Sequence, residues 1–268
     1  MADELQPGWP DLIAKIKART PARVLVDRAG AAYRTATQLE LRHAHAAARD
    51  AVRTELDLEQ DLGAELVNEF KLFEVSTLAR SKDEYLLRPD LGRRLNEAGK
   101  RQILARCPEE ADLQVVIGDG LSVTAVAVQA PRLLPLIMSG SKKRGWKSGQ
   151  PFLVRYCRVG VLNDIGELLR PRVAVLLIGE RPGLATAESL SAYMAYQPKH
   201  GDHDANRNLI SNIHQRGVAL DEAARRIGNL AEQMMNSKLS GVRLKEQTHR
   251  QITGDTGSEH QEIGPSKK

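Results

Sequence analysis

The sequence predicts an α/β protein, in which a helical N-terminal part precedes a Rossmann-like C-terminal domain with a parallel sheet. The first observation is the stretch 173–178, Val-Ala-Val-Leu-Leu-Ile, whose lack of charge is typical of a strand covered on both faces. The second is the alternation of apolar strands and helical patterns after residue 110, which favours parallel strands joined by helices. The third is a strand, a Gly118-Asp-Gly120 loop and a helix, half of a dinucleotide-binding pattern without its third glycine.

The pattern along the chain divides it into three regions: a mainly helical domain at residues 1–110, a Rossmann-like domain at 111–245 and a disordered tail at 246–268. In the first region, residues 73–78 are expected to be extended, and helices are expected at 12–19, 37–53, 58–72 and 89–105. Thr37 and Glu40 have the spacing of a capping box. The tail is polar and without periodicity, as disordered segments are.

The second region alternates between the two kinds of element. Strands are expected at 113–117, 152–155, 173–178 and 194–196, and helices at 122–136, 163–169, 189–193 and 221–238. Ser122 is a favourable N-cap for the first of these helices. A polar basic loop is expected at 140–149, and 204–215 is a polar stretch.

Composition limits the class of protein. The chain has 268 residues with 41% hydrophobic and 27% charged residues, as in soluble globular proteins. No apolar run approaches the roughly 20 residues of a membrane helix, and Cys107 and Cys157 are interpreted as a reduced cytoplasmic pair. The net charge is +5 and aromatic residues make up only 4%, so base-stacking platforms are scarce. We therefore expect neither a membrane nor a nucleic-acid partner.

The candidate site is the loop Gly179-Glu-Arg-Pro-Gly183, which follows the apolar strand. Ligands of open α/β sheets bind beyond the carboxyl ends of strands. Glu180 with Arg181 is either a general acid and the group that tunes it or an ion-paired loop. Amide and hydroxyl side chains follow nearby, at Ser189, Ser191, Asn206, Asn208, Ser211 and Asn212. Because such groups match a neutral polar ligand, a binding loop is favoured over a catalytic one.

Other candidate chemistry is weaker. His43 and His45 are two residues apart on a predicted helix and point to different faces. His200, His203 and His214 could gather with Asp202 and Asp204, but no cysteine pair accompanies them, so no metal site is predicted. No phosphate-binding loop or nucleophile elbow occurs. The basic residues at 88–106 are interpreted as a solvated face, with Arg88 and Arg93 as candidates for docking a partner.

A series of motifs runs in order along residues 12–245. They are Thr20-Pro-Ala-Arg23, Gly30, His45-Ala-Ala-Ala-Arg-Asp50, Arg88-Pro-Asp-Leu-Gly-Arg93, Gly118-Asp-Gly-Leu-Ser122, Arg158-Val159, Asp164-Ile-Gly-Glu167, Ile178-Gly-Glu-Arg-Pro-Gly-Leu184, Ser189-Leu190 and Ile210-Ser-Asn-Ile213. As a set in this order they are far more specific than any one of them. The set resembles the small (light) subunit of ethanolamine ammonia-lyase.

The resemblance implies an adenosylcobalamin-dependent enzyme that converts ethanolamine, and similar amino alcohols, to acetaldehyde and ammonia by a radical mechanism. It implies a large-subunit partner that holds the substrate, while this chain clamps the cobalamin at the interface and supplies no catalytic residue. The family's cobalamin contacts correspond to Val159, Glu180 and Leu209, where Leu209 offers an apolar or backbone contact. The Asp-x-His-x-x-Gly signature of some cobalamin proteins is missing, so the cofactor's own base is expected to stay on cobalt. The implied location is the cytoplasm, either free or inside a bacterial microcompartment.

Two alternatives belong to other classes. One is a stand-alone Rossmann-like enzyme that uses Glu180 as acid or base, although it has no complete set of catalytic groups. The other is a basic module that binds nucleic acid, which the scattering of 39 Lys and Arg among 34 Asp and Glu disfavours.

Overall fold

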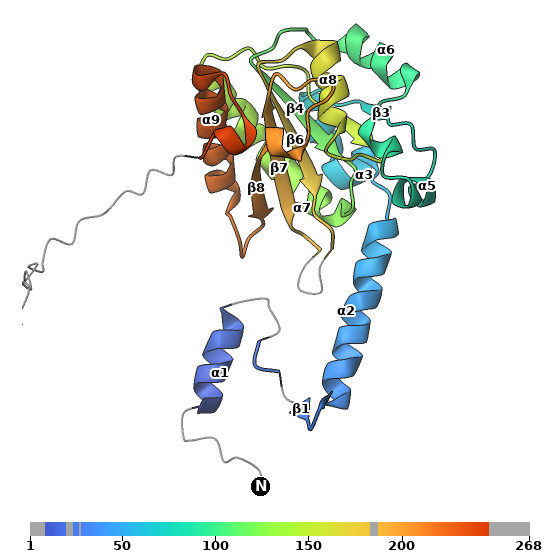
Figure 1. Ribbon diagram of the computed structural model, residues 1–268, viewed down its shortest axis with the longest axis vertical. Coiled ribbons are helices and arrows are strands. Elements are labelled where there is room, and N and C mark those ends of the chain that lie inside the picture. Colours follow the sequence, from blue (N-terminus) through green and yellow to red (C-terminus); the bar gives the residue numbers. More distant parts are fainter. Residues whose placement is uncertain (1–8, 20–23, 27, 183–186, 247–268) are drawn as a thin grey trace, which may run out of the picture.

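A six-stranded sheet lies between two layers of helices in the computed structural model, which describes residues 9–19, 24–26, 28–182 and 187–246 (Figure 1). Its strands are β3 (Glu74–Ser76), β4 (Leu113–Gly118), β5 (Phe152–Arg155), β6 (Val173–Gly179), β7 (Leu190–Tyr196) and β8 (Asn208–Ile213). Their order across the sheet is β3-β5-β4-β6-β7-β8. The strand β3 comes from the part that the sequence predicts to be mainly helical, and it pairs with β5.

The prediction of a parallel sheet is correct for β3, β5, β4 and β6 and wrong for β7. That strand is antiparallel to both of its neighbours, β6 and β8. The physical reason is the short connection after Gly179, because a parallel crossover needs a dozen or more residues. The predicted helix at 189–193 is also wrong, since Leu190, Ala192 and Met194 alternate along β7 and pack into one face of the sheet.

One face of the sheet is covered by α3 (Leu58–Leu62), α4 (Ala64–Glu69), α7 (Val123–Lys143) and α9 (Leu220–Ser237). The predicted helix at 58–72 is divided at Gly63, which has a positive φ of 87°. Ser122 caps α7 as predicted, by accepting from the backbone N–H of Ala125 at 3.1 Å. The helix then continues beyond its predicted end because its apolar stripe packs on the sheet. Among the described helices α7 has the length and composition to cross a membrane, but it is a core helix here.

The other face is covered by α6 (Glu97–Arg106) and α8 (Val161–Leu169), whereas α5 (Lys82–Leu87) packs Tyr85 in a separate small cluster with Ala79 and Tyr156. The predicted helix at 89–105 is replaced by a short 3-10 helix, η1 (Leu91–Arg93), and by α6. Asp164 of α8 explains the break, because its carboxylate accepts from the backbone N–H of Leu95 at 2.8 Å and from Nε of Arg94 at 2.9 Å. Two further 3-10 helices, η2 (Asp204–Asn206) and η3 (Gly241–Arg243), flank β8 and α9.

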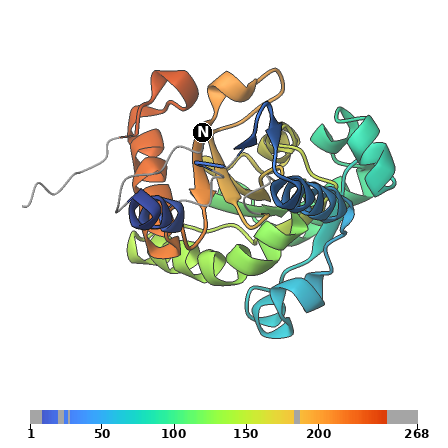
Figure 2. The same cartoon turned by 90° about the horizontal axis from the view of Figure 1, so that it is seen from below.

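The segment before residue 54 projects from this body and contacts it through α2, which meets α7 and pairs Arg53 with Asp83 of α5. It contains α1 (Trp9–Ala18), a small hairpin of β1 (Arg28–Ala29) and β2 (Ala32–Tyr33), and α2 (Thr35–Arg53). Neither α1 nor α2 buries a residue. Figures 1 and 2 show both helices projecting on the side of the molecule where β6 ends.

Candidate functional site

A cleft of about 210 Å³ opens at the carboxyl ends of β4, β5 and β6, where the sequence places the candidate loop. Its lining comes from α5, from the segments after these three strands, and from the start of β7. The lining residues are Tyr85, Leu121, Arg158, Val159, Ile178, Gly179, Glu180, Arg181, Ser191 and Tyr193. The cleft thus lies at the edge of the sheet where open α/β sheets bind their ligands.

Glu180 is held by the strands beside it. Its backbone N–H donates to the carbonyl of Ser189 at 2.9 Å. Its Oε1 accepts from Oγ of Ser191 at 2.7 Å and from the backbone N–H of Asn212 at 2.9 Å. Among the described residues Glu180 forms no ion pair with Arg181, so the geometry favours neither an ion-paired loop nor an acid tuned by this arginine. The carboxylate is fixed in place, and both of these side-chain contacts fall on one oxygen.

Arg158 forms part of the same lining and brings a cation to it. Its guanidinium carbon lies 4.3 Å from the centre of the Tyr85 ring, a cation–π distance. Its Nε is buried and has no hydrogen-bond partner within the described part of the chain. No carboxylate of a described residue lies within ion-pair distance of it. A buried donor without an acceptor is costly, so this nitrogen is a candidate contact for a ligand.

Two protic groups near the cleft, the Tyr85 hydroxyl and the Cys157 thiol, are not available as nucleophiles. Burial raises the pKa of the Tyr85 hydroxyl and of the Cys157 thiol, so both keep their protons at neutral pH. Tyr85 is also engaged, because its hydroxyl donates to the carbonyl of Cys157 at 3.0 Å. These residues shape the wall, and the cleft can bind and orient a ligand.

The three residues predicted to contact a cofactor are close but not equivalent. Val159 and Glu180 both line the cleft. Leu209 lies on β8, directly opposite Tyr193 of β7, and is 45% exposed. It therefore extends the surface beyond Tyr193 without lining the cleft itself.

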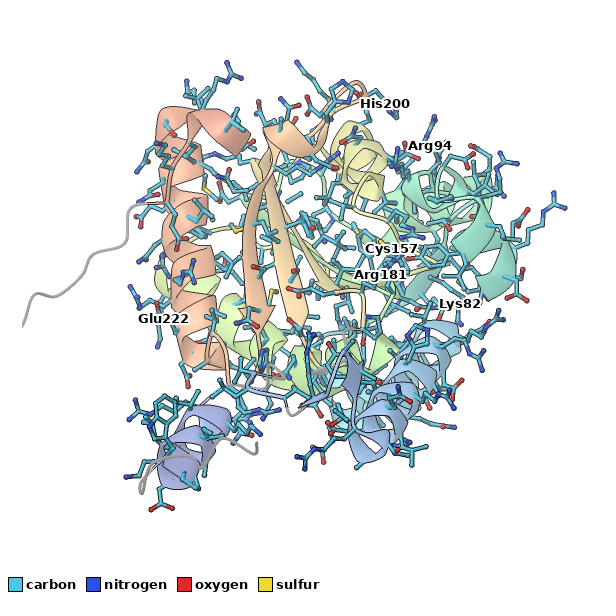
Figure 3. The ribbon with its side chains drawn as sticks, turned by 60° about the horizontal axis from the view of Figure 1, so that its bottom comes forward. Lys82, Arg94, Cys157, Arg181, His200 and Glu222 are labelled. Atoms are coloured by element: carbon cyan, nitrogen blue, oxygen red, sulfur yellow. The ribbon has the colours of Figure 1, made fainter. Side chains whose placement is uncertain are left out.

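A buried ion pair that sequence reasoning missed connects two walls of the cleft. Nζ of Lys82 lies 2.9 Å from Oδ1 of Asp119 and 3.0 Å from the carbonyl of Gly120. Lys82 belongs to α5, one turn from Tyr85, and Asp119 follows β4 just before Leu121. Burial raises the pKa of Asp119, and Lys82 opposes that rise. The sequence signal that could have indicated this ion pair is an acid between two glycines at the end of a strand. Figure 3 shows Lys82 and Arg181 in this part of the molecule.

A second cleft of about 310 Å³ begins at Gly160, next to Val159. Arg93 lines it, together with His200, Asp202, His203 and Asp204. The other docking candidate, Arg88, instead forms an exposed ion pair with Asp90 at 2.8 Å.

The histidines do not make a metal site in the described ranges. His214 stands apart, with Nε2 2.7 Å from Oδ1 of Asn212. No group of three His, Cys, Asp or Glu side chains arranged for a metal occurs among the described residues.

Comparison with known proteins identifies the family. Residues 10–245 match the sequence model of the family described as ethanolamine ammonia-lyase light chain. The chain is 41% identical over 233 residues to the ethanolamine ammonia-lyase small subunit of Clostridium acetobutylicum, over 87% of this chain and 94% of that protein. It is 42% identical over 240 residues to the small subunit of Listeria monocytogenes, over 90% of this chain and 80% of that protein. The chain therefore belongs to the ethanolamine ammonia-lyase light-chain family and is a subunit of a lyase.

Proposed function

We propose that this chain is the subunit of an adenosylcobalamin-dependent ethanolamine ammonia-lyase that closes over the cobalamin, while a large subunit holds the substrate. The assembled enzyme would convert ethanolamine to acetaldehyde and ammonia. The observation that carries the proposal is a cleft at the carboxyl edge with a fixed carboxylate and an unpaired buried donor. Family membership supplies the reaction, and the cleft supplies a binding role for this chain.

The residues of the cleft fit a corrin ring, which combines an apolar macrocycle with peripheral amide side chains. Val159, Leu121 and Ile178 give the lining apolar surface. Glu180 can accept an amide N–H, and Nε of Arg158 can donate to an amide carbonyl. Leu209 would add apolar contact beyond Tyr193. The cofactor-binding residues of the proposal are therefore Val159, Glu180 and Leu209, with Arg158 beside them.

Within this function the chain's own residues bind, orient and exclude water. Adenosylcobalamin supplies, when bound, the carbon radical that removes a hydrogen atom from the substrate. Burial raises the pKa of the Tyr85 hydroxyl and of the Cys157 thiol, so both keep their protons at neutral pH and do not act as nucleophiles. The hydrophobic wall keeps water from the reactive groups. We place no catalytic residue in this chain.

The finer fold assignment and the location belong to the same proposal. The unit from β4 to β6 has parallel strands with α7 on one face and α8 on the other, which supports a Rossmann-like relationship. The enzyme would work in the cytoplasm or inside a bacterial microcompartment.

Co-expression with a large subunit of the family tests the function. The purified complex should release ammonia and acetaldehyde from ethanolamine when adenosylcobalamin is present, and neither subunit alone should do so. Cobalamin binding is followed separately by its visible spectrum. Turnover by this chain alone would overturn the proposal, as would a stable complex that binds no cobalamin.

A further inference from the structure

The N-terminal arm, defined as residues 9–53, lacks the packing that ordinarily stabilises helices. In α1 and α2 no residue is buried, although α2 is 19 residues long. Most helical stability in proteins comes from packing of an amphipathic face. The arm exposes large apolar side chains that a packed helix would cover, namely Trp9, Leu12, Ile16, Tyr33 and Leu39.

The arm also carries the net charge of the whole chain. Residues 9–53 contain nine Lys and Arg against four Asp and Glu, a net charge of +5. The remaining residues contain 30 Lys and Arg and 30 Asp and Glu, which is neutral. On α2, Arg42 and Arg49 are two helical turns apart on one side, and neither forms an ion pair with a described residue. An acidic surface is the complement that this charge fits.

The apolar side of α2 is made mainly of small residues. Leu41, Ala44, Ala48 and Val52 follow one another at helical spacing and are half-exposed. Small side chains let a second helix approach closely. A helix that lies in a membrane surface instead inserts large residues such as Trp, Phe and Leu. The face of α2 therefore suits a protein surface better than a lipid one.

We propose that the arm docks onto the large subunit, with α2 packing its alanine side on a helix and its arginines on acidic groups. This inference rests on the proposed function, which supplies the partner. The family match starts at residue 10, so the arm belongs to what the light chains share. Figures 1 and 2 place the arm on the side where β6 ends, which is also the side of the cleft. One partner can therefore cover both.

Binding of the full-length chain to a purified, immobilised large subunit tests the arm. The variants are Ala48→Glu, which puts a charge on the apolar side, and the double variant Arg42→Glu with Arg49→Glu. We expect each to weaken the complex by about tenfold or more, and salt to weaken the wild-type complex more than the double variant. The matched control is Arg101→Glu, an exposed arginine on α6 in the body, which should leave affinity within about twofold.

Hydrogen exchange on the same samples reads the contact directly. Backbone amides of α2 should exchange quickly in the free chain and slow strongly when the large subunit is added. If wild type binds while both arm variants bind equally well and α2 stays unprotected, the docking arm is wrong and the proposed function stands. If wild type does not bind the large subunit, both proposals fail. Arm-dependent self-association of the isolated chain, or arm-dependent binding to anionic vesicles, would overturn the assignment of the partner.

Discussion

The body of this molecule buries its apolar side chains, whereas the arm leaves its own exposed. The body, from Leu56 onward, buries two clusters of apolar side chains on the two faces of one sheet. The arm builds two helices, of 10 and 19 residues, and buries none of their residues. The body is thus stabilised by contacts within itself, among them ion pairs between its own elements. Folding alone buries little of the arm's apolar surface. This indicates that the sequence of the arm is adapted to a surface outside this chain.

The body contains a buried ion pair, which the described part of the arm does not, and Lys82→Ala should give the largest effect. The side chains of Lys82 and Asp119 are 7% and 0% exposed, so truncating the lysine leaves a buried carboxylate unpaired. Breaking such a pair costs about 3–5 kcal/mol of unfolding free energy, measured by urea denaturation. The control is Lys100→Ala, which removes the Lys100–Glu97 pair on α6 and should cost under about 1 kcal/mol. Equal costs would contradict the contrast.

Truncation of an apolar side chain should lower the unfolding free energy strongly in the body and hardly at all in the arm. Leu176 of β6 is fully buried among the residues of one face, and Leu176→Ala should cost about 2–5 kcal/mol of unfolding free energy. Leu39 on α2 is 59% exposed, and Leu39→Ala should stay within about 0.5 kcal/mol. Both are read from urea unfolding of the free chain. A large loss for Leu39→Ala would mean that the arm packs on the body in solution.

Glu180→Ala should change cofactor binding rather than the stability of the body. Removal of a charge-assisted hydrogen bond should weaken cobalamin binding to the assembled enzyme by about 1.5–3 kcal/mol, measured by spectral titration. Unfolding of the free chain should change little, because Glu180 is only half-buried. Glu180→Gln keeps an oxygen for Ser191 and Asn212 and should lose less. Unchanged cofactor affinity in the alanine variant would remove Glu180 from the site.

The sequence predicts local features of the body well and distant ones poorly. β6 was predictable because a continuous apolar run and the Pro-containing loop after it are both local signals. The first part of β7 was mistaken for a helix because Ser189-Leu-Ser-Ala-Tyr193 is short and has no strong local preference, whereas the strand predicted at 194–196 is confirmed as the end of β7. Its pairing with β6 and β8 decides its conformation, and that pairing is not visible in a five-residue window.

The residues of the candidate site likewise differ in whether the local sequence indicates them. Glu180 could be proposed from the sequence because it follows a strand directly, at the edge where open α/β sheets bind their ligands. Lys82 and Arg158 were missed because their roles depend on partners far away in the sequence. Lys82 meets Asp119 across 37 residues, and Arg158 stacks on Tyr85 from a different element. Composition could show that charge was present but could not show which charges are buried.

The junction between arm and body gives the smallest predicted effect and the most direct check of the arm's independence. Arg53 at the end of α2 lies 2.7 Å from Asp83 of α5, and their side chains are 60% and 69% exposed. An exposed pair is worth about 0–1 kcal/mol because water screens it, so Arg53→Ala should barely change the unfolding of the body. Asp83→Ala and the double variant complete a thermodynamic cycle for the pair. A coupling above about 2 kcal/mol would show that this contact anchors the arm, whereas a smaller one leaves α2 free to be oriented by the surface it meets.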